Sequence, residues 1–175
     1  TIPFVGYAKS SEDTANYYPL GWMFGTIANS GAVYAVNQKI EYVNGGLSSN
    51  IKYQIPKTLT KLTVTGGYIS SYAFYGCNTL TDVILADGVT GMGPYSFYLC
   101  SNLVNIFFTN SIENIGDFTF YHCAAGSKMV LFFYGTRAEM YALVETPEVI
   151  RSATKYAYSE VSPYENPADP LDIWY

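Results

Sequence analysis

The feature that most constrains this chain is a repeat of 23 residues that is marked by a cysteine. Each cysteine follows a phenylalanine by three positions and a tyrosine by two. The repeated residues are Phe74, Phe97 and Phe120 with Cys77, Cys100 and Cys123. Self-similarity at a fixed period of this order is the signature of solenoids, in which each unit buries its apolar side against its neighbours. The spacing therefore predicts a solenoid of about three units.

Each unit also contains an apolar run of the form Leu-x-x-Leu-x-Leu. In repeats of this kind the run forms one short strand, and the strands of successive units stack in parallel. Because side chains alternate along a strand, Val83 and Leu85 are expected to point into the core and Ile84 outward. We therefore expect a mostly-β fold in which residues 59–134 form a leucine-rich-repeat solenoid with one open sheet face.

The segment before the repeats is interpreted as an N-terminal cap. A solenoid exposes core at its ends unless something covers them. Within residues 1–58, the runs 40–43 and 51–55 are strand-like and are separated by the turn-forming residues 44–46. This pattern predicts a β-rich cap.

The segment after the repeats, residues 135–175, is interpreted as a C-terminal cap and tail. Thr136-x-x-Glu139 is a capping box, which predicts a helix over about residues 137–145. A strand is expected from Lys155 to Ser159. We expect the two caps and the repeats to form one structural domain.

Composition excludes several classes of function. Hydrophobic residues make up 49% of the chain and charged residues 13%, which is typical of a packed protein. The net charge is −5 with no basic run, so nucleic-acid binding has no electrostatic basis. No apolar run approaches the roughly 20 residues of a transmembrane helix. The chain starts at Thr1 without a visible signal peptide, so we expect a processed or cut part of a longer protein.

No catalytic residue, metal site or cofactor is predicted. The cysteines stack one per coil instead of converging, so we interpret them as buried thiols and not as zinc ligands. A disulfide between cysteines of neighbouring coils is geometrically possible. His122 is the only histidine and is expected at the surface. The neighbours expected beside Asp82 in its row are Asn105 and Lys61, so a second carboxylate is missing and the paired carboxylates of a glycosidase are not present.

The open sheet face is the most informative feature for function. Its middle column is expected to be Thr63, Ile84, Phe107 and Val130, its next column Thr65, Ala86, Thr109 and Phe132, and its preceding column Lys61, Asp82, Asn105 and Lys128. An exposed apolar patch on this face would be typical of a contact site. The candidate binding residues are Ile84, Phe107, Val130, Phe132, Lys61, Asp82, Asn105 and Lys128. Alternatively, the N-terminal segment or the acidic tail folds over the patch.

The repeat pattern resembles that of a known family. The sequence Ile-Gly-x-x-x-Phe-x-x-Cys-x-x-Leu-x-x-Ile, carried by residues 91–106 and 115–123, looks like the BspA-like leucine-rich repeat of bacterial cell-surface proteins. Similar flanking segments are 19–26, 55–67 and 132–143. Met140 stands where a tryptophan is usual. The resemblance implies a solenoid fold, an extracellular or cell-surface setting and a scaffold family with varied ligands.

These observations together favour a non-catalytic, surface-exposed binding or adhesion module. We expect it to recognise a protein or a glycan through the open face, without a cofactor. A second interpretation is a structural spacer or cap in a larger bacterial surface protein, and a third is a glycan-acting enzyme. The exposure of Phe107 and Phe132 discriminates the first two, because a spacer would bury both rings.

Overall fold

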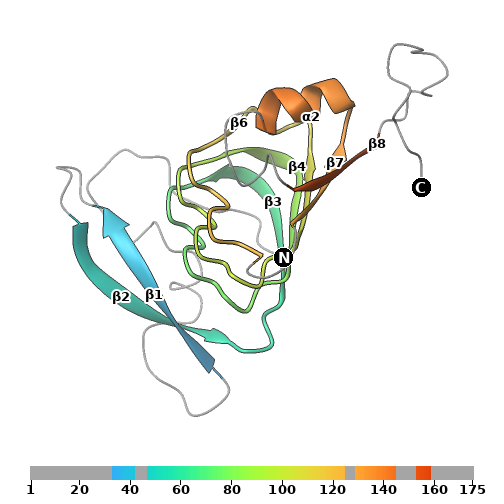
Figure 1. Ribbon diagram of the computed structural model, residues 1–175. Helices are drawn as coiled ribbons and strands as arrows, with labels where there is room; N and C mark the ends of the chain where they lie inside the picture. Colours follow the sequence, from blue (N-terminus) through green and yellow to red (C-terminus); the bar gives the residue numbers. More distant parts are fainter. Residues whose placement is uncertain (1–32, 42–46, 125–128, 145–152, 159–175) are drawn as a thin grey trace.

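The computed structural model describes residues 33–41, 47–124, 129–144 and 153–158 (Figure 1). Its elements are β1 (Val33–Glu41), β2 (Leu47–Pro56), β3 (Lys61–Ile69), β4 (Asp82–Met92), β5 (Asn105–Thr109), β6 (Asn114–Ile115), β7 (Val130–Tyr134), α2 (Arg137–Val144) and β8 (Thr154–Tyr158). The candidate binding residue Lys128 lies outside the described residues.

The described residues form a mostly-β solenoid, as the sequence predicts, and one short helix follows the repeats. The solenoid has about four turns, whereas the spacing of the cysteines predicts about three units. The main sheet has the strand order β3-β4-β5-β7-β8, and every neighbouring pair is parallel. The strand β4 is long enough to pair with β5 at its start and with β6 near its end. Figure 1 shows the coils stacked one on the next, with the return segments opposite the sheet.

The N-terminal strands form an antiparallel pair, β1 with β2. The predicted run 51–55 lies within β2, and that part of the prediction is confirmed. The predicted run 40–43 overlaps β1 (Val33–Glu41) at residues 40 and 41, and residues 42 and 43 lie outside the described residues. The strand begins earlier than the apolar residues indicate, because its extent follows from pairing with β2. At the end of β2, Ile55 is completely buried in the solenoid core.

The return side of the solenoid is held together by stacked aromatic side chains. The Phe74 and Phe97 rings stack with centroids 4.9 Å apart, and Phe97 and Phe120 follow at 5.6 Å. All three rings are buried. Because each ring is repeated one coil later, the apolar surface of one unit covers that of the next.

The three cysteines lie beside these rings as buried free thiols. The Cys100 Sγ donates a hydrogen bond to the Phe74 carbonyl oxygen at 3.1 Å, and Cys123 repeats this contact with the Phe97 carbonyl oxygen at 3.1 Å. Burial raises the pKa of the Cys100 and Cys123 thiols well above the usual value. They therefore stay protonated and act as small apolar side chains with one donor each.

Two positions in each coil of the return side adopt a left-handed backbone. The φ angles are positive at Tyr72, Tyr95 and Phe118, and again four residues later at Gly76, Leu99 and His122. Glycine adopts this conformation without strain, but leucine and histidine do not. The sharp corners are therefore imposed by the stacking of the coils and not by the local residue.

The helix α2 follows the last repeat and begins at the predicted capping box. The backbone N–H and the hydroxyl of Thr136 both donate to the Glu139 carboxylate, at 2.7 and 2.8 Å, and the Glu139 N–H donates to the Thr136 hydroxyl at 3.3 Å. Met140 anchors the helix in the core. The predicted strand at 155–159 is present as β8 (Thr154–Tyr158), which pairs with β7.

Candidate functional site

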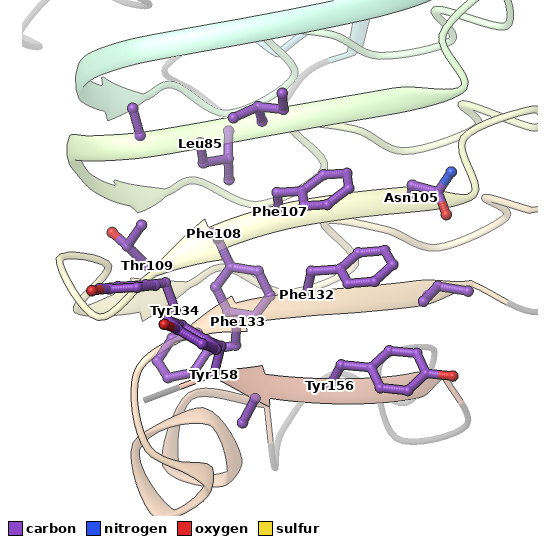
Figure 2. Close-up of a pocket in the computed structure, with 14 residues that line it drawn as sticks. Leu85, Asn105, Phe107, Phe108, Thr109, Phe132, Phe133, Tyr134, Tyr156 and Tyr158 are labelled. Atoms are coloured by element: carbon purple, nitrogen blue, oxygen red, sulfur yellow. The ribbon is translucent and has the colours of Figure 1, made fainter. Parts of the chain in front are cut away.

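The outward-facing side chains of the sheet form a continuous apolar row. In the register, Ile84 lies beside Phe107, Phe107 beside Phe132, and Phe132 beside Tyr156. We call these four residues the central row. Figure 2 shows Phe107, Phe132 and Tyr156 on three successive strands.

The predicted columns were wrong at the last repeat. Val130 pairs with Asn105 and not with Phe107, and Phe132 takes the place beside Phe107. The chain from Cys123 to β7 is two residues longer than the chain from Cys100 to β5. This extra length shifts the strand by two residues, so the outward side chains still face outward. Each of them lies one column earlier than predicted, with Val130 in the column of Asn105 and Phe132 in the column of Phe107.

The three rings of the central row are packed against each other. Phe107 and Phe132 have centroids 4.4 Å apart and planes 8° from parallel. Phe132 and Tyr156 follow with centroids 5.5 Å apart and planes 18° from parallel. Stacking explains why Phe107 and Phe132 are half-buried, although they lie on the outer face. A binding module would leave both rings exposed, and a structural spacer would cover both. The observed exposure of Phe107 and Phe132 is intermediate between these two cases.

A second row of side chains runs beside the central row, two residues further along each strand. It consists of Thr109, Tyr134 and Tyr158, which are paired in register. The Tyr134 and Tyr158 rings have centroids 5.4 Å apart. Tyr134, Tyr156 and Tyr158 are 43%, 41% and 47% exposed. These tyrosines are therefore more accessible than Phe107 and Phe132, which are half-buried.

The two rows and the strand positions between them enclose a groove of about 880 Å³. Its lining comes from β4, β5, β7 and β8, so the groove crosses four strands of the sheet (Figure 2). The lining residues include Phe107, Phe132 and all three exposed tyrosines, and none of them carries a formal charge. A concave, mostly apolar surface of this volume, half of whose lining residues are aromatic, is typical of a ligand-binding site.

Polar groups lie at one edge of the groove. Asp82 accepts hydrogen bonds from the Thr81 hydroxyl at 2.7 Å and from the Asn105 amide at 2.8 Å. The hydrogen bond from Thr81, followed by that from Asn105, lowers the pKa of the Asp82 carboxyl. Lys61 pairs with Asp82 in register and is exposed. The two hydrogen bonds to Asp82 join residues of the protein itself and hold these side chains in place at the edge of the groove.

Sequence reasoning missed the tyrosines at the C-terminal end of the face. The 23-residue spacing stops at Cys123, so it gave no register for Tyr134, Tyr156 or Tyr158. The available signal was the alternation in Thr154–Tyr158, where tyrosines occupy every second position. A strand with that alternation, added to the sheet in parallel, would have extended the apolar face.

The described residues contain no arrangement that suggests catalysis. His122 is exposed, and its ring contacts the rings of Tyr121 and Tyr98 at centroid distances of 4.2 and 5.6 Å. Within the described ranges, no group of three or more His, Cys, Asp or Glu side chains is placed to hold a metal ion.

Comparison with known proteins identifies the family of this solenoid. A family model described as BspA type leucine-rich repeat region matches residues 48–142 in six copies, which is more than half of the chain. The chain belongs to the BspA-type leucine-rich repeat family. The resemblance noted in the sequence is thereby confirmed. The chain has no match among the curated proteins and none among the solved structures.

Family membership bears on function only in general terms. BspA-type leucine-rich repeats are typically non-catalytic and indicate a protein-interaction or surface module. The family is associated with bacterial surface proteins. In the part of the chain that the structure describes, no helix has both the length and the apolar character needed to cross a membrane.

Proposed function

We propose that this BspA-type solenoid is a non-catalytic binding or adhesion module at the bacterial surface, and that it recognises its partner through the aromatic groove. The observation that carries the proposal is the uncharged groove of about 880 Å³, which is lined by the central row and by the exposed tyrosines. Tyrosine is one of the side chains that are enriched among the residues supplying most of the binding energy at interfaces.

Two features of the fold support this use of the face. The rings sit on strands of a continuous parallel sheet, and a site on strands is held more rigidly than a site on loops. The stacking of Phe107 on Phe132 and of Phe132 on Tyr156 limits their rotation, so little side-chain entropy is lost when a partner binds.

The experiment compares the protein with two single variants on arrays of purified proteins and of defined glycans. Tyr156→Ala removes an exposed ring of the groove. Phe118→Ala is the matched control, because Phe118 is 48% exposed but lies on the return side. Circular dichroism and urea denaturation establish that both variants are folded.

We expect the wild type to bind at least one array component. Tyr156→Ala should weaken this binding by about tenfold, and Phe118→Ala should leave it unchanged. If no component binds, or if both variants bind as the wild type does, the groove is not the recognition surface. That result would favour a structural spacer.

A further inference from the structure

The geometry of the groove bears on which class of partner it accepts, and this step rests on the proposed function. A protein surface and a glycan make different demands on an aromatic site. A sugar ring packs its C–H groups against the electron-rich face of an aromatic ring and directs its hydroxyls at polar groups beside it. Apolar protein side chains need only apolar surface, including ring edges.

Most ring faces in the central row are already occupied by the neighbouring side chain. Phe132 has Phe107 on one side at 4.4 Å and Tyr156 on the other at 5.5 Å, both with planes nearly parallel to its own. Phe107 has Ile84 as its neighbour on the remaining side. The row therefore presents ring edges more than free faces, and edges carry the positive end of the aromatic quadrupole. Such edges suit aliphatic side chains, other aromatic faces and peptide carbonyl oxygens.

Two polar side chains that line the groove already have hydrogen-bond partners within the protein. The Asn105 amide donates to Asp82 at 2.8 Å, and the Thr109 hydroxyl is hydrogen-bonded to the Ser111 hydroxyl at 2.8 Å. A glycan hydroxyl directed at either side chain would compete with the hydrogen bond that is already there, and an unpaired buried polar group is costly. These two side chains are therefore poorly suited to bind a glycan.

The absence of charged residues in the lining also favours an apolar partner. The protein carries a net charge of −5, yet none of the groove's lining residues is ionisable as an acid or a base at neutral pH. A buried charge on a partner would find no counter-charge in the lining, and its desolvation would be uncompensated. The complementary partner surface is therefore uncharged as well.

We infer that the groove binds an uncharged, apolar segment of a polypeptide, and that it does so independently of salt. The partner's aliphatic or aromatic side chains lie against the ring edges between the central row and the tyrosines. The tyrosine hydroxyls at the rim stay hydrated, as is usual where an aromatic side chain borders water.

The test is a selection from a random-peptide phage library, run in parallel with a defined glycan array. Binding is then measured with the wild type and with two lysine variants. Ala86→Lys places a charge in the groove without removing a ring. Thr90→Lys is the matched control, since Thr90 is an exposed residue of the same strand but does not line the groove.

We expect selected peptides that are rich in uncharged apolar residues, with dissociation constants that change less than about twofold between low and high salt. Ala86→Lys should weaken their binding by about tenfold or more, and Thr90→Lys should not. Peptides with charged consensus residues and salt-dependent affinity would overturn the inference.

The two proposals fail in different ways. Glycan binding that Ala86→Lys abolishes and Thr90→Lys preserves would overturn the apolar polypeptide partner but leave the groove as a binding site. If Ala86→Lys retains both peptide binding and glycan binding, both proposals are overturned.

Discussion

Phe107 and Phe132 stack with ring centroids 4.4 Å apart although the strands that carry them are separated by a repeat longer than its predecessors. The longer connection moves Phe132 into the column of Phe107 and Ile84 and brings Tyr134 beside Thr109. One change of length therefore gathers the aromatic side chains into adjacent rows. Four predictions test this description of the fold and its face.

The first prediction separates the open face from the core. Phe107→Ala should lower the free energy of unfolding by about 1–2 kcal/mol, because the ring is half-buried and stacked on one side. Phe97→Ala should cost about 3–5 kcal/mol, because Phe97 is completely buried between two stacked rings. Urea denaturation with a common m-value measures both changes. Equal losses would mean that the face is part of the core.

The second prediction concerns the pH dependence of the helix cap. Hydrogen bonds from the backbone N–H and then the hydroxyl of Thr136 lower the pKa of the Glu139 carboxyl. Because the folded pKa lies below the unfolded one, the carboxylate's contribution is fully present above the unfolded pKa. It is lost as pH falls through the folded pKa.

The measurement compares the wild type with Glu139→Gln in urea denaturation from neutral to acidic pH. The wild type should be the more stable at neutral pH, and the difference should shrink on acidification. Thr136→Ala, which removes the reciprocal hydroxyl, should cost about 1 kcal/mol at neutral pH. A difference between wild type and Glu139→Gln that grows on acidification would contradict the assignment.

The third prediction concerns a hydroxyl in the return side of the solenoid. Ser96 is fully buried, and its Oγ has no hydrogen-bond partner among the described residues. One coil later, Thr119 places its hydroxyl on the carbonyl oxygens of Gly116 and Gly93, at 2.6 and 3.2 Å. Ser96→Ala should therefore be neutral or stabilise the fold, whereas Thr119→Val should destabilise it by about 1 kcal/mol.

Thermal and urea denaturation of the two variants give the sign of each effect. Alanine already stands at the equivalent position one coil earlier, as Ala73, so the smaller side chain fits this column. A clear loss of stability in Ser96→Ala would show that the hydroxyl has a partner.

The fourth prediction concerns the last strand. Lys155 continues the inward column of Val83, Ile106 and Leu131. Burial lowers the pKa of its ammonium, and the Nζ donates to the Ala153 carbonyl oxygen at 3.2 Å. An inward-pointing charge on a terminal strand opposes the addition of further strands. In the described sheet, β8 is the last strand of the order.

Lys155→Leu should therefore raise the tendency of the protein to self-associate, while Lys155→Gln should change it little. Sedimentation velocity over a range of concentrations measures the difference between the variants and the wild type. If Lys155→Leu associates no more than the wild type does, the lysine does not protect the edge of β8.

Much of the fold could be predicted because its signals are local. The spacing of Cys77, Cys100 and Cys123 indicates the coil length directly, and Thr136 with Glu139 marks the start of α2 within one turn. The inward positions of Val83 and Leu85 follow from alternation along one strand. Each of these inferences depends on residues close together in the chain.

The candidate site depends on pairing between strands, which local signals do not determine. The sequence by itself determined that Ile84, Phe107 and Phe132 face outward, because a change of two residues preserves alternation. Only the tertiary structure decided that Phe132 stacks on Phe107, that Tyr156 follows it, and that the rings enclose a groove. The physical reason is that register follows the length of the connection and the hydrogen bonding of the strands, and both are satisfied only in the assembled sheet.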